Sequence, residues 1–154
     1  DSDEERVTST WAVRRQQPLK LRVGVAATCI GTVGGIGAYH TSVLLGNEEY
    51  FFENSGILCG PRLQSHAIPQ AAAEKPETEV LDCGMTICTG FDLMRRLSPY
   101  FGAYSYDLIH KNCNAFTDAA LWYLLGERLD SRFTRLDRFM KNGAPLTTAV
   151  MNQV

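Results

Sequence analysis

The chain has 154 residues, of which 45% are hydrophobic and 21% are charged, the composition of one globular domain with a core of its own. The formal net charge of −2 excludes the strongly basic surface that nucleic-acid-binding proteins carry. No apolar run approaches the roughly 20 residues that a membrane-spanning helix needs.

The N-terminal part begins with a polar stretch and then turns β-prone. Residues 1–18 are polar and charged without periodicity, so we expect an N-terminal arm with little fixed structure. The stretch LKLRVGVAAT, residues 19–28, alternates apolar and polar residues at its start and is rich in valine, which predicts a strand. The glycine-rich segment CIGTVGGIG, residues 29–37, is expected to connect this strand to the next.

Two β-prone runs then flank a turn signal. Residues 38–46 and 48–53 are separated by the Gly46-Asn47 pair, which predicts a β-hairpin. We expect a loop over NSGILCGPR, residues 54–62, and a surface excursion over the proline- and alanine-rich residues 64–78. The stretch TEVLDCGMTIC, residues 78–88, predicts a further strand with a bend at Gly84.

The hydrophobic period becomes helical in the second half of the chain. One helix is predicted around residues 91–98 and ends near Pro99. A second is predicted over residues 114–125, with Gly126 as its C-terminal cap. A final short helix is predicted where Leu129, Phe133, Leu136 and Met140 recur at helical spacing. Strands first and helices later predict an α+β domain.

The cysteines do not form a recognisable framework. There are five, an odd number, at irregular spacing and without a Cys-x-x-Cys pair: Cys29, Cys59, Cys83, Cys88 and Cys113. This pattern argues against a disulfide scaffold and a zinc ribbon. We therefore expect free thiols in a reducing compartment, and neither a metal nor another cofactor.

Cys113 lies between Asn112 and Asn114 at the predicted start of a helix. The unpaired N–H groups and the dipole of a helix start favour an anion, so a thiolate there gains nucleophilic character. Asn112 is suited to cap the helix. A buried, inert cysteine is the commoner explanation of such a residue, and the pattern alone leaves both interpretations open.

A nucleophilic cysteine needs a base, normally a histidine. His40 lies inside a predicted strand, His66 lies in the excursion where a surface position is expected, and His110 is too close along the chain to point at the thiol. His40 is therefore the candidate base. A buried structural histidine is an equally supported interpretation of the same residue.

Two ordered blocks resemble the PPPDE peptidases, the desumoylating isopeptidase family. GGIGAYHTSVLLGNEEYFFENSGI, residues 34–57, resembles the family's histidine block, Gly-Ile-x-Tyr-His-Thr-x-Val followed by a hairpin and Gly-Ile. Residues 106–136 begin YDLIHKNCNAFT and resemble its cysteine block, Tyr-x-Leu-x-x-x-Asn-Cys-Asn-x-Phe-(Ser/Thr). LDCGMT, residues 81–86, resembles the Leu-Gly-x-Thr strand between them.

The resemblance implies a papain-like α+β fold in permuted order. An antiparallel sheet or barrel from the N-terminal half would pack against helices of the C-terminal half, in one domain over residues 19–141 followed by a tail over residues 142–154. The implied activity is that of a cysteine isopeptidase acting after the C-terminal glycines of SUMO or ubiquitin, with Cys113 as nucleophile and His40 as base. A homodimer and a cytoplasmic location, with the nucleus as a second compartment, are further expectations.

Other residues receive roles by their position in these blocks. Asn112 and Asn114 are candidate oxyanion donors, and Tyr39, Phe51 and Tyr106 are candidate groove walls, with core packing as the alternative for each. The family pattern offers no clear third member of a triad. Two alternative functions stay open: a thioesterase or amidase that uses the same dyad, and a non-catalytic module that binds ubiquitin-like proteins.

Overall fold

The computed structural model describes residues 17–72 and 77–142. The predictions for residues 1–16 of the arm and for the tail from residue 143 lie outside the described residues. The strands are β1 (Leu21–Val33), β2 (Ile36–Leu45), β3 (Glu48–Glu53), β4 (Gly56–Pro61) and β5 (Thr78–Thr86). The helices are the short 3-10 turn η1 (Gln64–His66), α1 (Ala67–Ala72), α2 (Gly90–Leu97), α3 (Cys113–Leu125) and α4 (Arg135–Asn142).

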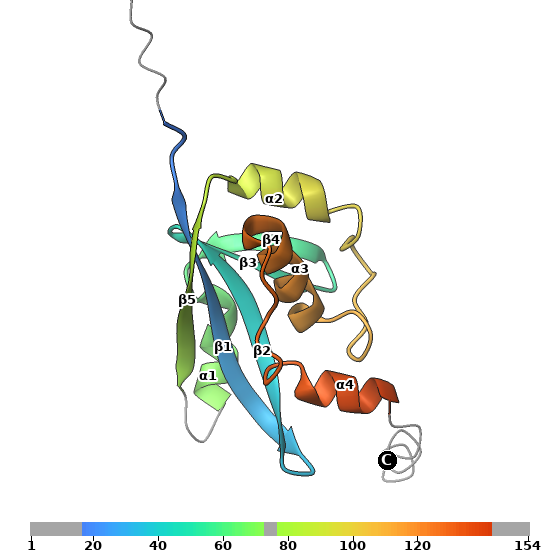
Figure 1. Cartoon of the computed structure of the whole chain (residues 1–154). Coiled ribbons are helices and arrows are strands. Elements are labelled where there is room, and N and C mark those ends of the chain that lie inside the picture. Colours follow the sequence, from blue (N-terminus) through green and yellow to red (C-terminus); the bar gives the residue numbers. More distant parts are fainter. Residues whose placement is uncertain (1–16, 73–76, 143–154) are drawn as a thin grey trace, which may run out of the picture.

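The five strands form one antiparallel sheet in the order β4-β3-β2-β1-β5 (Figure 1). Helices α2, α3 and α4 follow the last strand in sequence. A sheet from the first half of the chain and helices from the second confirm the predicted α+β class. None of the helices in the described part of the chain is both long and apolar enough to cross a membrane.

The glycine-rich segment is strand rather than connection, so that prediction is wrong. β1 continues to Val33 and β2 begins at Ile36, which leaves Gly34-Gly35 as the whole turn. Both glycines have positive φ, 57° and 80°, which a two-residue turn needs in order to match the twist of its strands. The hairpin at Gly46-Asn47 is confirmed, with β2 and β3 paired on either side of it.

The predicted loop over residues 54–62 is also wrong in part. β4 occupies most of it, and Ile57 and Leu58 pair with Phe52 and Phe51 of β3. The tertiary partner supplies the cross-strand contacts that the short segment lacks alone. The strand predicted over residues 78–88 is confirmed over residues 78–86. Its bend is a register shift: Val23 faces Gly84 while Gly24 faces Asp82.

Two of the three predicted helices are confirmed in place. α2 begins with a capping box between Thr89 and Asp92, and α3 ends at Gly126, whose φ of 69° is the left-handed cap expected of glycine. The last helix starts later than predicted, at Arg135. Leu129 and Phe133 lie in the non-helical segment before this helix, and both side chains are buried. Their helical spacing therefore reflected burial and not a helix.

The sheet separates an apolar core from a buried polar cluster. On one face, residues such as Val25, Val43 and Phe52 pack with Phe116 and Leu121 of α3. Because side chains alternate along a strand, their neighbours face the other way. There the hydroxyls of Thr28 and Ser42 both contact His66 of η1. This second face carries one of the two candidate catalytic residues.

Candidate active site

Asn112 sets the position of Cys113 by capping α3. Its side-chain oxygen accepts a hydrogen bond of 3.1 Å from the Ala115 N–H, and its amide nitrogen donates one of 3.1 Å to the Leu108 carbonyl. The predicted capping role is thus confirmed. Cys113 is the first residue of the helix and is only 7% exposed, so its backbone N–H has no partner inside the helix.

The Cys113 sulfur lies against the edge of β2. It is 4.0 Å from the Tyr39 carbonyl oxygen, and the Thr41 N–H also contacts it. β2 pairs with β3 only over Val43–Leu45, so the edge before Val43 is open to α3. The candidate nucleophile therefore contacts the backbone of both residues that flank His40.

Asn114 ties the start of α3 to its surroundings. Its side-chain oxygen accepts a hydrogen bond of 2.7 Å from the Thr41 hydroxyl, and its amide nitrogen lies 3.1 Å from the Tyr39 carbonyl oxygen and 3.0 Å from the Asp137 carboxylate. The side chains of both candidate oxyanion residues, Asn112 and Asn114, thus hold protein partners. These contacts fix Cys113 between β2 and α4.

The environment favours the neutral thiol of Cys113. Burial raises the pKa of the thiol, and the carboxylate of Asp137 adds to the rise. The Thr41 N–H and the Tyr106 hydroxyl oppose this shift in pKa by stabilising the thiolate. The structure thus runs against the expectation that the helix start alone would lower the pKa of Cys113, because desolvation outweighs it.

Two of the three candidate groove residues lie near Cys113. The Tyr106 hydroxyl contacts Cys113, and burial raises the pKa of Tyr106 to about 12 with a contribution from the neighbouring thiol. The Tyr39 ring packs edge-on against Phe133, with 5.0 Å between ring centroids. Phe51 is buried, 6% exposed, and the alternation of β3 directs it away from the face on which Phe52 packs against α3.

His40 points to the polar face of the sheet. Its Nε2 atom lies 2.8 Å from the Ser65 hydroxyl oxygen, and its ring centroid lies 4.6 Å from that of His66. Burial lowers the pKa of His40 to about 4, so the imidazole is neutral at pH 7. Within residues 17–72 and 77–142, no hydrogen bond joins the Cys113 thiol to the His40 ring. The structure brings the thiol to the strand that carries His40, the candidate base.

The surface position predicted for His66 is wrong. The residue is fully buried, with Nδ1 2.8 Å from the Thr28 hydroxyl and Nε2 2.8 Å from the Ser42 hydroxyl. Burial lowers its pKa to about 3, and the nearby His40 adds to the shift. His110 is exposed and contacts Asp107, as expected of a residue that does not face the thiol.

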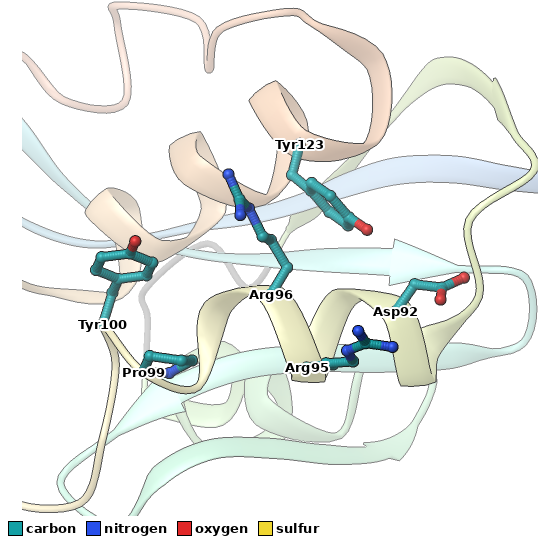
Figure 2. Close-up of a pocket in the computed structure, with 6 residues that line it drawn as sticks. All are labelled: Asp92, Arg95, Arg96, Pro99, Tyr100 and Tyr123. Carbon is teal, nitrogen blue, oxygen red and sulfur yellow. The ribbon is translucent and has the colours of Figure 1, made fainter.

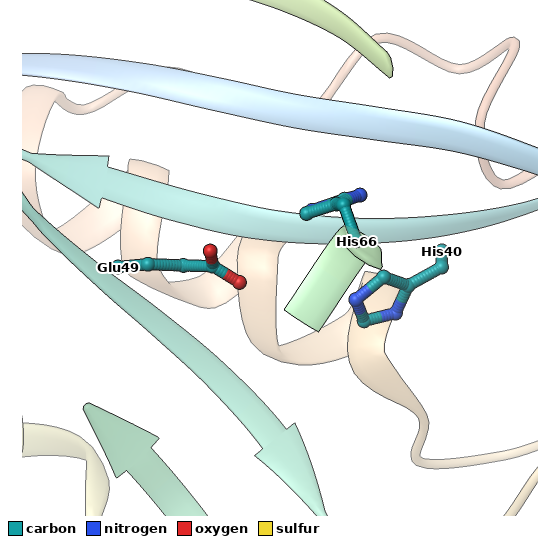
Figure 3. A group of neighbouring side chains, drawn as sticks. All are labelled: His40, Glu49 and His66. Carbon is teal, nitrogen blue, oxygen red and sulfur yellow. The ribbon is translucent and has the colours of Figure 1, made fainter. Parts of the chain in front are cut away.

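Figure 3 shows His40 and His66 beside Glu49 of β3. Their nitrogen and oxygen atoms all lie within 4.8 Å of one another, which is close enough to consider a cation. Hydroxyl groups already contact both nitrogens of His66 and Nε2 of His40. A metal ion bound at these three nitrogens would have to displace the hydroxyls, so the hydrogen bonds of His66 and His40 compete with a cation.

A surface hollow lies away from Cys113 and His40. It has a volume of about 540 Å³ and lies between α2 and α3 (Figure 2). Its lining contains none of the predicted site residues and consists of Asp92, Arg95, Arg96, Pro99, Tyr100 and Tyr123. This hollow therefore does not adjoin the candidate site around Cys113 through any of the residues that line it.

Sequence reasoning missed Ser65 and Glu49. Both backbone and side chain of Ser65 donate hydrogen bonds to Glu49, and Ser65 also contacts His40. Glu49 is fully buried, although its sequence context, beside a second glutamate after a hairpin turn, is typical of a surface residue. The one available signal was the strand alternation, which places Glu49 on the same face of the sheet as His40.

Comparison with known proteins identifies the family. A sequence model described as the PPPDE putative peptidase domain matches residues 5–153. Desumoylating isopeptidase 1 of Rattus norvegicus is 31% identical over 104 residues, which cover 65% of this chain and 58% of that protein. The human protein of the same name is 30% identical over 104 residues, with the same shares.

A fungal relative gives a similar match. The DeSI-like protein sdu1 of Schizosaccharomyces pombe is 29% identical over 132 residues, covering 76% of this chain and 60% of that protein. The chain thus spans about three fifths of the length of these relatives. Since the family match covers nearly the whole sequence, the chain belongs to the PPPDE peptidase family.

Proposed function

We propose that this protein is a cysteine isopeptidase that cleaves the bond after the C-terminal glycines of SUMO. The observation that carries the proposal is the contact of Cys113, at the start of α3, with the backbone on both sides of His40. The names of the relatives support the reaction class and the modifier. Ubiquitin is the second modifier to be tested, as its tail also ends in glycine.

The first step uses His40 as a general base. Because burial lowers the pKa of His40 and raises the pKa of Cys113, both groups are neutral at rest, and the proton moves as the sulfur attacks. The thiolate sulfur bonds to the carbonyl carbon of the last glycine, and the charged His40 then gives its proton to the leaving lysine amine. Water, deprotonated by His40, hydrolyses the thioester and releases the modifier with a free carboxylate.

The oxyanion formed in these steps needs preorganised donors. We assign the backbone N–H of Cys113 as one donor, since the first residue of a helix has no intrahelical partner for it. Asn112 and Asn114 stay candidates for the second donor, although each side chain already bonds to protein groups. A small rotation of one of these amides on substrate binding would be required.

The groove is proposed to run along the open edge of β2. A modifier tail that ends in glycines binds as an extended strand, and the backbone groups on this edge that bond neither to β3 nor to α3 would hold it. Tyr39 and Tyr106 would line this groove beside Cys113. With a histidine strand preceding a cysteine helix, we also propose that the α+β fold is the papain-like one in permuted order.

A SUMO vinyl sulfone probe tests this proposal directly. We expect a covalent adduct on Cys113, located by peptide mass spectrometry, together with release of SUMO from an isopeptide-linked lysine peptide. Cys113→Ser and His40→Gln should each lose both signals. A ubiquitin vinyl sulfone probe, measured alongside, shows which modifier is accepted. Hydrolysis of an acyl thioester tests the thioesterase alternative. Binding of SUMO without an adduct or turnover would instead indicate a non-catalytic module and contradict the proposal.

A further inference from the structure

The hydrogen bonds around Ser65 define the protonation of the His40 ring. A serine hydroxyl has one proton to donate. Ser65 donates it to the Oε1 atom of Glu49, which also accepts the Ser65 N–H at 3.2 Å. The Ser65 oxygen can therefore only accept from Nε2 of His40, 2.8 Å away. It follows that Nε2 carries the proton and that Nδ1 of His40 carries the free lone pair.

Glu49 is an unusual residue to find at this place. It is fully buried on β3, and its second oxygen, Oε2, has no hydrogen-bond partner among the residues that the structure describes. Burial of a carboxylate with an unmet oxygen costs stability, so such groups call for an explanation. Burial raises the pKa of Glu49, while its bonds to Ser65 lower it, so the Ser65 contacts favour the charged carboxylate.

We propose that Ser65 and Glu49 are the positioning residues of His40, which complete a Cys113–His40–Ser65–Glu49 relay. Glu49 holds the Ser65 hydroxyl so that it accepts Nε2–H, and this leaves Nδ1 as the one atom of the ring that can take the Cys113 proton. When His40 becomes charged, the polar chain to Glu49 stabilises it, as the third group of a catalytic triad does. This inference rests on the proposed role of His40 as base.

The other titratable group facing His40 has a different role. His66 packs on the His40 ring, but its two nitrogens bond to Thr28 and Ser42 and not to Ser65. It is a neutral neighbour that fills the space beside the base. Thr28 thus offers a matched control: a buried hydroxyl that bonds to a histidine in the same cluster, but to the histidine that we do not place in the relay.

The experiment compares Ser65→Ala, Glu49→Gln and Thr28→Val with the parent chain. Imidazole ¹⁵N NMR should show His40 protonated on Nε2 in the parent and in Thr28→Val, and a mixture of tautomers in Ser65→Ala. In Ser65→Ala, the rate of Cys113 alkylation by iodoacetamide and kcat should both fall about tenfold or more, with KM within about twofold of the parent value. Acid–base catalysis contributes a rate enhancement of roughly 10²–10⁴-fold, and only part of it depends on the orientation of the base. Ser65→Thr, which keeps the hydroxyl, should restore most of the rate.

Glu49→Gln keeps the volume and an acceptor for Ser65 but removes the charge. We expect Glu49→Gln to keep the Nε2–H tautomer of His40. It should lower kcat, since the charged form of His40 loses the negative charge that stabilises it through Ser65. This variant also tests the relay if Ser65→Ala does not fold. Equal behaviour of Ser65→Ala and Thr28→Val, with a parent-like tautomer in both, would overturn the inference. His40→Gln separates the two proposals. If alkylation of Cys113 is unchanged in His40→Gln, the assignment of His40 as base fails. If alkylation is slow in His40→Gln but keeps the parent rate in Ser65→Ala and Glu49→Gln, only the relay is refuted.

Discussion

The Cys113 sulfur lies 4.0 Å from the carbonyl oxygen of Tyr39, the strand residue directly before His40. The first turn of α3 therefore packs on the open edge of β2, and two residues far apart in the sequence meet there. The thiol faces this edge, whereas the His40 ring extends to the polar face of the sheet and contacts Ser65. The candidate nucleophile lies at the edge of this strand, and the ring of the candidate base lies on its polar face.

Replacement of Cys113 by serine should remove turnover and leave the fold intact. The hydroxyl is close in size to the thiol but is a far weaker nucleophile with a neutral histidine base, so we expect kcat/KM to fall by about 10³-fold or more. The change in unfolding free energy should stay within about 1 kcal/mol. Cys29→Ser, at an exposed position, is the control and should keep full activity. Loss of cooperative unfolding in Cys113→Ser would mark the residue as structural instead.

The buried histidines should make the protein less stable in acid. The pKa of His66 is about 3 in the folded state and 6.5 in the unfolded reference, so between these values the unfolded chain binds more protons. Stability is full above about pH 6.5 and falls as the pH drops towards 3, by a few kcal/mol at roughly 1.4 kcal/mol per pKa unit. Urea unfolding at a series of pH values measures this slope.

Matched variants assign the acid slope to its residue. His66→Gln removes the titrating group, so the slope between pH 6.5 and pH 3 should decrease even if the variant is less stable throughout. His110→Gln changes an exposed histidine and should keep the parent slope. If the His66 and His110 variants titrate alike, the acid sensitivity arises elsewhere in the chain.

Asn112 offers a way to separate capping from catalysis. Asn112→Ala loses the bond to the Ala115 N–H and should lower the unfolding free energy by about 1 kcal/mol. Asn112→Asp keeps an acceptor for that N–H but loses the amide that donates to the Leu108 carbonyl, so it should retain only part of the stability. Its charge beside Cys113 should raise the thiol pKa and slow alkylation at neutral pH. Chemical unfolding and alkylation rates are the two measurements. A loss of turnover in Asn112→Ala without slower alkylation would support an oxyanion role.

Tyr106 distinguishes a hydroxyl role from a role in packing. Tyr106→Phe keeps the ring contact with Phe52 but removes the hydroxyl, one of the groups that lower the thiol pKa of Cys113. We therefore expect the alkylation profile of Cys113 to move to higher pH, with a change in unfolding free energy of about 1 kcal/mol or less. An unchanged profile would restrict Tyr106 to the wall of the groove and the core.

The sequence determined the elements whose signals are local. The Gly46-Asn47 turn determined one hairpin because glycine adopts the positive φ, 58° at Gly46, that the turn needs. Asn112 and Gly126 determined the two ends of α3 by capping it. The order of the histidine and cysteine blocks was enough to indicate the family. In each case a few neighbouring residues carry the physical cause, so no knowledge of the rest of the chain is needed.

The tertiary structure decided what depends on partners distant in sequence. β4 needs β3 beside it before its short apolar stretch forms a strand. Leu129 is buried from an irregular segment although its spacing suggested a helix. His66 and Glu49 are polar residues in sequence contexts typical of the surface, yet the sheet buries both. Their burial is set by the hydroxyls of Thr28, Ser42 and Ser65, which satisfy most of their polar atoms. These hydroxyls come from three separate segments, β1, β2 and η1, so they leave no local pattern, and only the folded chain brings them together.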